Sequence, residues 1–413
     1  MININISSII CEYNPLHNGH KYQIDLTRNL TKCEGLIAIM SGNFVQRGEP
    51  AIIDKWRRAE MALKNGVDLV IELPSAFALS SAEFFAHGAV SILNDLKIVN
   101  SICFGSEAGQ IEPLMAIAEI LTEEPHEYRM LLKDYLDQGL TFPLSRSKAL
   151  LSYIAVNSPN NIVKFKELLE TSNNILGIEY CKSLIRNKSH IQPFTIKRLG
   201  GSYNSSEVSQ IFSSATAVRK LMKQMDSLDL IKSQLPVSSF NIIMQLIDEN
   251  YDFAHSDNIF DYIKYKAITD RHESLKNIPE TGEGLHKRIY KYLYTSESLE
   301  QLIKAVKTKR YTYTKLCRIL TQYFIGFENF PLQKLYSSRC NYVRVLGLNT
   351  TGAEILKDIK TKSDMNIITK FPQKPDNVFL QLDLASTKAY SIINKNIRFN
   401  EDFLRSPITE FSK

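Results

Sequence analysis

The sequence predicts an α/β fold in which helices cover a parallel β-sheet, with a second, α+β domain at the C-terminal end. In the first half of the chain, short apolar runs alternate with longer stretches of helical periodicity; the runs lie at 6–11, 35–40, 67–73, 101–105 and 194–199. Continuous apolar strands separated by helices are typical of parallel sheets. The length of 413 residues exceeds what one hydrophobic core usually spans, which favours two domains.

The helices of this pattern follow the strands in order. Helical periodicity follows the first three runs, at 21–30, 55–66 and 81–96. Gly66 is typical of a helix end. We expect a helical insertion at 113–190 and another helix from near Ser213 through AVRKLMKQM (217–225). Right-handed crossovers should place ligands beyond the carboxyl ends of the strands, where the strand order switches.

The second half of the chain predicts a separate unit. Residues 230–330 have mostly helical periodicity. Beyond them, 342–349 and 365–370 resemble strands, with a helical stretch at 352–360 between them. We therefore expect two domains, at 1–230 and 231–413.

Composition excludes several classes of protein. The net charge is +6, from 50 basic and 44 acidic residues, which permits a polyanionic partner without requiring one. The sequence has no long apolar window of membrane-span length, and the start, MININISSII, lacks the features of a secretory signal. We therefore expect a cytoplasmic protein without membrane contact. The 6 cysteines lack zinc-site spacing, so we expect reduced thiols in apolar surroundings and no metal site.

The stretch EYNPLHNGH (12–20) follows the first predicted strand. Asn14-Pro15 predicts a turn, and a helix should begin near Asn18 or Gly19. His17 and His20 would then lie in the first helical turn, where unpaired N–H groups attract phosphate. Two imidazoles there can donate hydrogen bonds to phosphoryl oxygens and stabilise the charge that develops during nucleotidyl transfer.

Three other interpretations of the histidine pair stay open. A metal site is less well supported, because the helical zinc motif places its histidines four residues apart, with a glutamate between them. A dinucleotide site is disfavoured because the loop has no GxGxxG. The two residues could also be ordinary surface or core histidines.

Several sequence motifs also resemble those of a known family. HNGH resembles the HxGH signature of the nucleotidyltransferase superfamily. Five stretches together resemble the bacterial tRNA(Met) cytidine acetate ligase family. They are EYNPLHNGH, MSGNFVQRGEPAIIDKWRRAEMALKNGVDLVIELP, FGSE, NNILGIEY and TIKR. The resemblance implies a Rossmann-like nucleotidyltransferase domain. It implies that ATP and acetate form acetyl-adenylate, and that the acetyl group passes to N4 of the wobble cytidine of elongator tRNA(Met).

The resemblance also implies site residues. His17 and His20 would be catalytic, with Gly19 allowing the α-phosphate to lie between their rings. The implied ATP-binding residues are Ile10, Cys11, Glu12, Tyr13, Asn14, Pro15, Leu16, Asn18, Gly19, Lys21, Gly105, Asn173, Asn174 and Arg198. A tight turn at Gly105, helix capping by the asparagines and a solvated Arg198 are the alternatives. Mg²⁺ is expected with ATP, although the sequence shows no ligand cluster for it.

Two further stretches could belong to the site. SSATAVR (213–219) resembles the ISSTxIR element of small-molecule adenylyltransferases, so Ser213, Thr216 and Arg219 could contact the triphosphate; an ordinary Ser-capped helix is the alternative. Gln46, Arg47 and Gly48 follow the second strand and could form the acetate pocket, hold a lid, or be structural. Trp56 is expected to be a packing residue.

The segment 304–318, KAVKTKRYTYTKLCR, is basic and predicts an RNA surface. Lys residues and Arg residues neutralise phosphates, and Tyr311 and Tyr313 could stack on bases. The candidate tRNA-binding residues are Lys307, Lys309, Arg310, Lys315 and Arg318, with possible extensions at Lys334, Arg339, Arg344, Asp54, Lys55, Arg57 and Arg58. A solvated helix face is the alternative.

Two other functions stay open from the sequence. One is a small-molecule adenylyltransferase acting on a phosphorylated acceptor, and the other is a non-catalytic RNA-binding relative. The oligomeric state is not indicated by the sequence.

Overall fold

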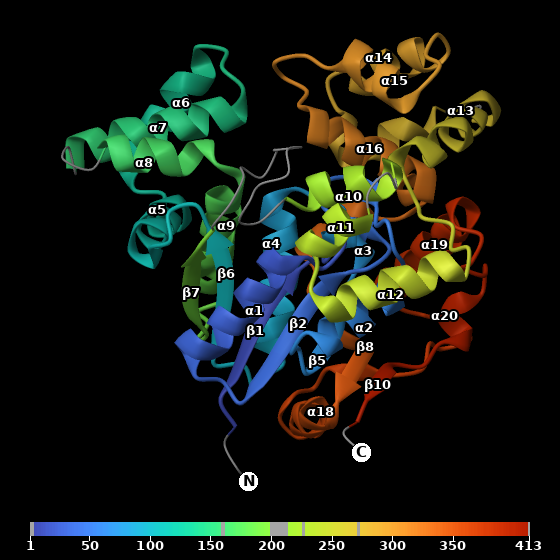
Figure 1. Ribbon diagram of the computed structural model, residues 1–413. Coiled ribbons are helices and arrows are strands. Elements are labelled where there is room, and N and C mark those ends of the chain that lie inside the picture. Colours follow the sequence, from blue (N-terminus) through green and yellow to red (C-terminus); the bar gives the residue numbers. More distant parts are fainter. Residues whose placement is uncertain (1–3, 158–161, 199–213, 225–227, 271–272, 412–413) are drawn as a thin grey trace.

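The computed structural model describes residues 4–157, 162–198, 214–224, 228–270 and 273–411. One sheet forms the centre, with the strand order β10-β8-β5-β2-β1-β6-β7 and with β9 paired to β8 (Figure 1). The chain runs outward from β1 in both directions, through β2 and β5 on one side and β6 and β7 on the other. The strand order therefore switches between β1 and β6, as in a doubly wound nucleotide-binding fold.

The five strands expected from the apolar runs are confirmed, with small shifts of their ends. They are β1 (Ile6–Cys11), β2 (Gly35–Ser41), β5 (Leu69–Leu73), β6 (Ser101–Ser106) and β7 (Gln192–Lys197). All neighbouring pairs among these five are parallel. A short antiparallel hairpin, β3 (Phe44–Val45) with β4 (Glu49–Pro50), follows β2.

Three helices of the first half are in the expected places. They are α1 (Asn18–Thr31), α2 (Lys55–Lys64) and α4 (Ala82–Asp95), and the short α3 (Ser75–Ala78) was not predicted. Gly66 has φ +103°, which suits the stop expected after α2. The predicted insertion between β6 and β7 comprises α5 (Ile111–Glu123), α6 (His126–Asp137), α7 (Phe142–Asn157), α8 (Ile162–Glu170) and α9 (Ser172–Arg186).

Helices dominate the middle of the chain, as the periodicity predicts. They are α10 (Ala215–Gln224), α11 (Leu228–Gln234), α12 (Val237–Asp248), α13 (Phe260–Thr269), α14 (Leu285–Leu293), α15 (Leu299–Val306), α16 (Tyr313–Ile325) and α17 (Leu332–Ser337). Short 3₁₀ helices lie among them in the described ranges, at Ser256–Ile259, Ser274–Asn277, Pro279–Thr281 and Phe327–Asn329. None of the helices in the described part of the chain is long and apolar enough to cross a bilayer.

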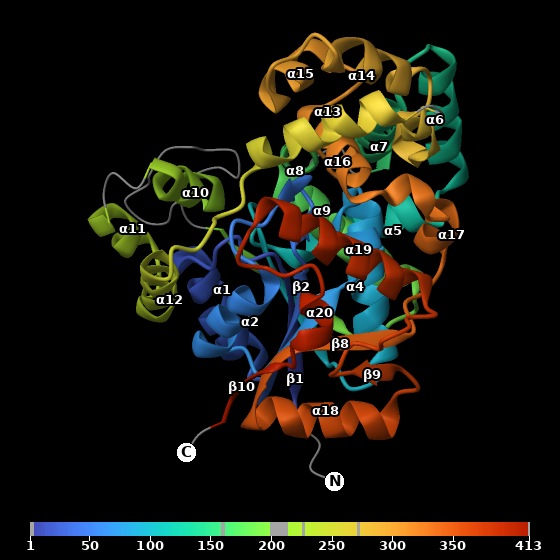
Figure 2. The same cartoon turned by 90° about the vertical axis from the view of Figure 1, so that its right-hand side faces the viewer.

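The last strands belong to the same sheet as the first. β8 (Tyr342–Asn349) pairs antiparallel with β5, and both β9 (Asn366–Ile368) and β10 (Ile408–Glu410) pair parallel with β8. The remaining helices are α18 (Thr350–Lys362), α19 (Val378–Ile393) and α20 (Glu401–Leu404); α18 lies across the end of the sheet nearest the N-terminus (Figure 2). The boundary at residue 230 stays a prediction, but the central sheet draws strands from both sides of it.

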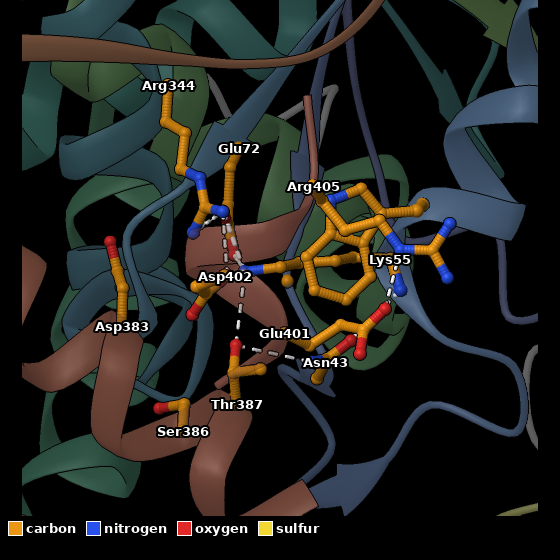
Figure 3. Close-up of polar contacts among 12 residues, drawn as sticks. Asn43, Lys55, Glu72, Arg344, Asp383, Ser386, Thr387, Glu401, Asp402 and Arg405 are labelled. Atoms are coloured by element: carbon orange, nitrogen blue, oxygen red, sulfur yellow. Dashed lines mark hydrogen bonds and ion pairs between the residues drawn. The ribbon is translucent and has the colours of Figure 1, made fainter. Parts of the chain in front are cut away.

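A buried ionic cluster fastens the last part of the chain to the first. Lys55 Nζ lies 2.8 Å from Glu72 Oε1 and 3.0 Å from Asp402 Oδ1. Arg344 Nη2 lies 2.6 Å from Asp402 Oδ1, and Arg344 Nη1 lies 3.2 Å from Glu72 Oε2 (Figure 3). The four side chains come from α2, β5, β8 and α20. Buried charges are tolerated when they are paired in this way.

Two smaller predictions are confirmed. All six cysteines are buried and free. Trp56 is 2% exposed, and its ring packs beside Lys55 and Arg405, so it is a packing residue.

Candidate active site

A cavity that is partly open to solvent lies where the strand order switches. The carboxyl ends of β1 and β6 form its floor, as the rule for parallel sheets predicts. α1, α9 and α10 and the β3–β4 hairpin supply the other walls. The lining residues are Ile10, Cys11, Glu12, Tyr13, Asn14, His17, His20, Gln23, Gln46, Arg47, Phe85, Phe104, Gly105, Asn173, Leu176, Tyr180, Arg198, Ser214, Ala215, Thr216 and Arg219.

His17 and His20 cap the N-terminus of α1, and backbone N–H groups fix the protonation of both rings. His17 Nδ1 accepts a hydrogen bond from the backbone N–H of Gly19 at 3.1 Å. His20 Nδ1 accepts one from the backbone N–H of His17 at 3.3 Å. A neutral imidazole that accepts at Nδ1 carries its proton on Nε2. Both rings therefore carry an Nε2–H group and border the cavity.

The two rings lie against each other, which corrects one expectation. Their centroids are 3.8 Å apart and their planes differ by 24°. A phosphate cannot lie between rings that are already in contact, so it must meet their edges. Burial, together with the positive charges of the nearby Arg198 and Arg219, lowers the pKa of His17 to about 3. Burial, His17 and Arg198 lower the pKa of His20 as well, so both rings are neutral near pH 7.

A buried arginine holds the strand ends beneath the cavity. Arg58 is 0% exposed, and its guanidinium donates to the carbonyl oxygens of Glu12, Ser41 at 3.1 Å and Ile53 at 2.9 Å. Glu12 and Ser41 lie at the carboxyl ends of β1 and β2. Arg58 thus positions the backbone from which the cavity residues project.

The β3–β4 hairpin connects β1 to α10. The Gln46 N–H donates to Glu12 Oε1 at 2.8 Å, and Arg47 Nη1 donates to Thr216 Oγ1 at 3.0 Å. Gly48 has φ +79°, and a Cβ there would overlap the backbone of α16. Glycine is therefore required at this close approach. The QRGEP loop therefore contacts Glu12, α10 and α16, and its first two residues also line the cavity.

α10 brings the SSATAVR stretch to the cavity. The Ser214 hydroxyl accepts from the Ala217 N–H at 3.2 Å and so caps the helix. Arg219 Nη1 donates to the carbonyl of Asn14 at 3.0 Å, and Arg219 Nη2 lies 2.6 Å from Glu49 Oε1. Thr216 and Arg219 line the cavity as expected, whereas Ser213 lies outside the described residues.

The opposite wall is formed by β6, β7 and α9. Gly105 lies inside β6, and a Cβ there would be 3.2 Å from Cγ of Arg198, so the glycine makes room for that side chain. Glu107 accepts hydrogen bonds from the N–H groups of Asn173 at 3.4 Å and Asn174 at 2.9 Å. Asn173 also lines the cavity, while the side-chain oxygen of Asn174 accepts from Ala108 N–H at 3.1 Å. Asn174 therefore supports the wall.

Most residues that the sequence places in the ATP site line this cavity, and six do not. Leu16 is 0% exposed in the core, and Lys21 pairs with Asp25 on the outer face of α1. Asn18 Nδ2 donates to the Ser233 carbonyl at 2.9 Å. Those six residues, which lie behind or beside the wall, are Pro15, Leu16, Asn18, Gly19, Lys21 and Asn174.

Sequence reasoning missed a set of lining residues. They are Gln23, Phe85, Phe104, Leu176, Ala215 and Tyr180. Most lie within helices or strands that also form the core, so no local pattern distinguishes them from core residues. The strand-end position of Phe104, next to Gly105, was the only available hint.

Five charged residues that the sequence assigns to an RNA surface are buried. They are Asp54, Lys55, Arg58, Arg318 and Arg344. Arg318 Nη2 lies 3.3 Å from Glu280, and Arg344 belongs to the ionic cluster. The expectation of a surface role for these five is therefore wrong.

The charge of the cavity suits an anionic ligand. Three guanidinium groups, from Arg47, Arg198 and Arg219, line it, and Glu12 is the single acidic residue among its described lining residues. The described residues contain no group of three or more His, Cys, Asp or Glu side chains that could hold a metal ion. The arrangement can bind phosphates and donate hydrogen bonds to their oxygens.

Comparisons with known proteins agree with this geometry. A sequence profile of the HIGH Nucleotidyl Transferase family matches residues 4–403. The chain is 51% identical over 405 residues to the tRNA(Met) cytidine acetate ligase of Clostridium novyi (strain NT), covering 98% of this chain and 99% of the relative. It is 50% identical over 406 residues to that of Clostridium botulinum (strain Okra / Type B1), covering 98% of each.

Solved structures give the same result. Thermotoga maritima TmcAL bound with alpha-thio ATP superposes with a TM-score of 0.89 at 35% identity, covering 99% of this chain and 100% of that one. The apo form of the same protein superposes with a TM-score of 0.91 at 34% identity, with the same coverage. The chain therefore belongs to the HIGH nucleotidyl transferase family and, within it, to the tRNA(Met) cytidine acetate ligases.

Proposed function

We propose that this protein uses ATP to activate acetate as acetyl-adenylate and transfers the acetyl group to N4 of the wobble cytidine of elongator tRNA(Met), giving N4-acetylcytidine. The products of one cycle are then AMP, pyrophosphate and the acetylated tRNA. The observation that carries the proposal is the pair of neutral histidines at the switch point, surrounded by three arginines. The family membership of the chain supports the choice of reaction.

The proposed first step is an attack of the acetate oxygen on the α-phosphate of ATP. The α-phosphate gains charge as pyrophosphate leaves, and the Nε2–H groups of His17 and His20 are placed to donate to it. Arg198 and Arg219 add positive charge beside the same rings. Mg²⁺ would arrive with the triphosphate, whose charge it offsets, because the described residues form no metal site of their own.

The tRNA surface is proposed for the segment between α15 and α16. Lys307, Lys309 and Arg310 are exposed there, and Tyr313 at the start of α16 is 48% exposed. Lys315 Nζ lies 5.8 Å from the ring centre of Tyr311. α14, α15 and α16 lie on the side of the sheet to which the carboxyl end of β1 points (Figure 1). Because this is also the side of the cavity, a tRNA held there could reach the adenylate. The proposed place of action is the cytoplasm.

One experiment tests the proposal directly. The protein is incubated with ATP, labelled acetate and bulk tRNA, and the tRNA is digested to nucleosides. We expect label in N4-acetylcytidine, with none formed without ATP and with formation about 100-fold slower in a His20→Ala variant. Label transfer to a phosphorylated small molecule would indicate an adenylyltransferase instead. Normal N4-acetylcytidine in the tRNA(Met) of a deletion strain would contradict the proposal.

A further inference from the structure

Acetyl transfer to the cytidine amine requires a proton acceptor, and this inference rests on the proposed function. When N4 attacks the acetyl carbonyl carbon, a C–N bond forms and the C–O bond to AMP breaks. The nitrogen must also lose one proton to become an amide. A side chain that accepts this proton has to reach the cavity and be unprotonated near pH 7.

The histidines are poor candidates for this base. Each accepts a backbone N–H bond at Nδ1 and keeps its proton at Nε2. Neither nitrogen can take a further proton without breaking the capping arrangement at the start of α1. The pair is built to donate hydrogen bonds, as the first step requires.

The other polar groups of the cavity do not accept a proton either. Burial raises the pKa of the Cys11 thiol and of the Tyr13 phenol, so both stay protonated. Arg47, Arg198 and Arg219 are permanent cations. The remaining polar lining residues carry amides or hydroxyls. Among the described lining residues, only Glu12 has a side chain suited to the task.

Glu12 is also held in a defined position. It is the first residue after β1, and Arg58 fixes its carbonyl from below. Its Oε1 accepts a hydrogen bond from the Gln46 N–H at 2.8 Å. Its Oε2 receives no hydrogen bond from the described residues, so one lone-pair face is available to a ligand.

We propose that Glu12 is the general base of the acetyl-transfer step. Its carboxylate takes the proton that leaves N4 as the amide forms, while AMP departs with the electrons of the broken C–O bond. The proton then passes to water, and the site is ready for another cycle. The first step, in which acetate attacks ATP, releases no proton and does not need this group.

The surroundings of Glu12 tune its basicity in a useful direction. Burial raises the pKa of Glu12 above its ordinary value of 4.5, and the negative charge of Glu49 raises it too. The Gln46 N–H, Arg47 and Arg219 act in the opposite sense and limit the rise of this pKa. A base is most effective when its pKa approaches the working pH. Transfer should therefore slow in acid, as pH falls through a pKa above 4.5.

The test separates the two half-reactions in the Glu12→Gln variant. Glutamine keeps the size of the side chain and can still accept the Gln46 N–H. Because Glu12 also lines the ATP cavity, acetate-dependent ATP–pyrophosphate exchange can fall somewhat, but it should fall much less than transfer. Single-turnover transfer from preformed acetyl-adenylate to tRNA should fall by about 100-fold or more. Its rate should also lose the acidic limb of the pH profile. The matched control is Glu354→Gln, an exposed position on α18 that should change neither step.

Several outcomes would overturn the proposal. Transfer by the variant at the wild-type rate and with the wild-type pH profile would exclude Glu12 as the base. Loss of exchange and transfer together, in a variant that melts like wild type, would make Glu12 a binding residue. If Glu12→Gln does not fold, Glu12→Asp replaces it. This variant should transfer more slowly, with normal exchange and with the acidic limb of the pH profile retained. Transfer at the wild-type rate would overturn the base role. Absence of acetate-dependent exchange in wild type would instead contradict the proposed function.

Discussion

Arg219 Nη2 lies 2.6 Å from Glu49 Oε1, so a side chain of the SSATAVR stretch is held by the loop that follows the second strand. Arg47 of the same loop donates to Thr216. Two stretches that are far apart in the sequence thus fix one another at the mouth of the cavity. Arg219 can present its guanidinium to a triphosphate only if this contact keeps it in place.

Removing that contact should weaken ATP binding. We expect Glu49→Gln to raise KM for ATP in acetate-dependent exchange by about fivefold, since a partly exposed charge-assisted bond contributes about 1 kcal/mol. The maximal rate should change little. Asp257→Asn is the control. Asp257 pairs at an exposed position with Lys223, which lies on the same helix as Arg219. An unchanged KM in Glu49→Gln would show that Arg219 is positioned by other contacts.

Histidine removal should affect turnover more than affinity. His20→Ala should lower kcat for adenylate formation by about 100-fold, because each donor aimed at developing charge contributes about that much. The dissociation constant of ATP should rise by less than about fivefold. His126→Ala, at an exposed position on α6, serves as the control. Similar losses in kcat and in ATP affinity would mean that the ring acts only in binding.

The neutral histidines also predict how stability depends on pH. In the unfolded chain His17 takes up a proton near pH 6.5, whereas in the folded protein its pKa is about 3. Between these values the unfolded state binds more protons, so the free energy of unfolding should fall as pH decreases from 7 to 5. Urea unfolding at both pH values measures this. A His17→Gln variant should show a smaller decrease, and an equal decrease would contradict the assignment.

Breaking the buried ionic cluster should destabilise the whole protein. Arg344→Met leaves Asp402, which is 0% exposed, short of one partner, and the free energy of unfolding should fall by about 3–5 kcal/mol. Lys304→Gln breaks an exposed pair with Glu300 and should cost less than about 0.5 kcal/mol. Urea denaturation of the two variants gives the comparison. A small loss in Arg344→Met would show that methionine packing compensates for the lost pair.

Changes in the basic segment should affect tRNA affinity and leave adenylate formation unchanged. The combined change Lys307→Glu, Lys309→Glu and Arg310→Glu should weaken tRNA binding and reduce its dependence on salt, because fewer counterions are released. Acetate-dependent exchange should stay normal. The control reverses Lys357 and Lys360 on α18, at the far end of the sheet. Equal tRNA affinity in both variants would place the tRNA elsewhere.

The local sequence predicted the elements of the fold well. Apolar runs and helical periodicity placed β1, β2, β5, β6 and β7 and the helices around them, because burial on both faces leaves a local signal. The same local logic placed β8 and α18. It could not show that β8 lies beside β5, because strand pairing between distant segments has no local pattern.

The site was predicted where chemistry and local structure coincide. His17 and His20 stood out because two imidazoles at a helix start have few other uses. The stacking of their rings, and the burial of Arg58, Arg318 and Arg344, depend on packing that a single sequence does not reveal. The residue type of a lysine or arginine does not indicate whether its side chain contacts tRNA or a buried carboxylate.

The position of β8 has a consequence for synthesis on the ribosome. Leu69 of β5 pairs with Leu348 of β8. The edge of β5 therefore stays unpaired during synthesis until most of the chain has left the ribosome. An open strand edge invites pairing with other chains. Nascent protein should therefore depend on chaperones, and a fragment that stops near residue 230 should aggregate when it is produced alone.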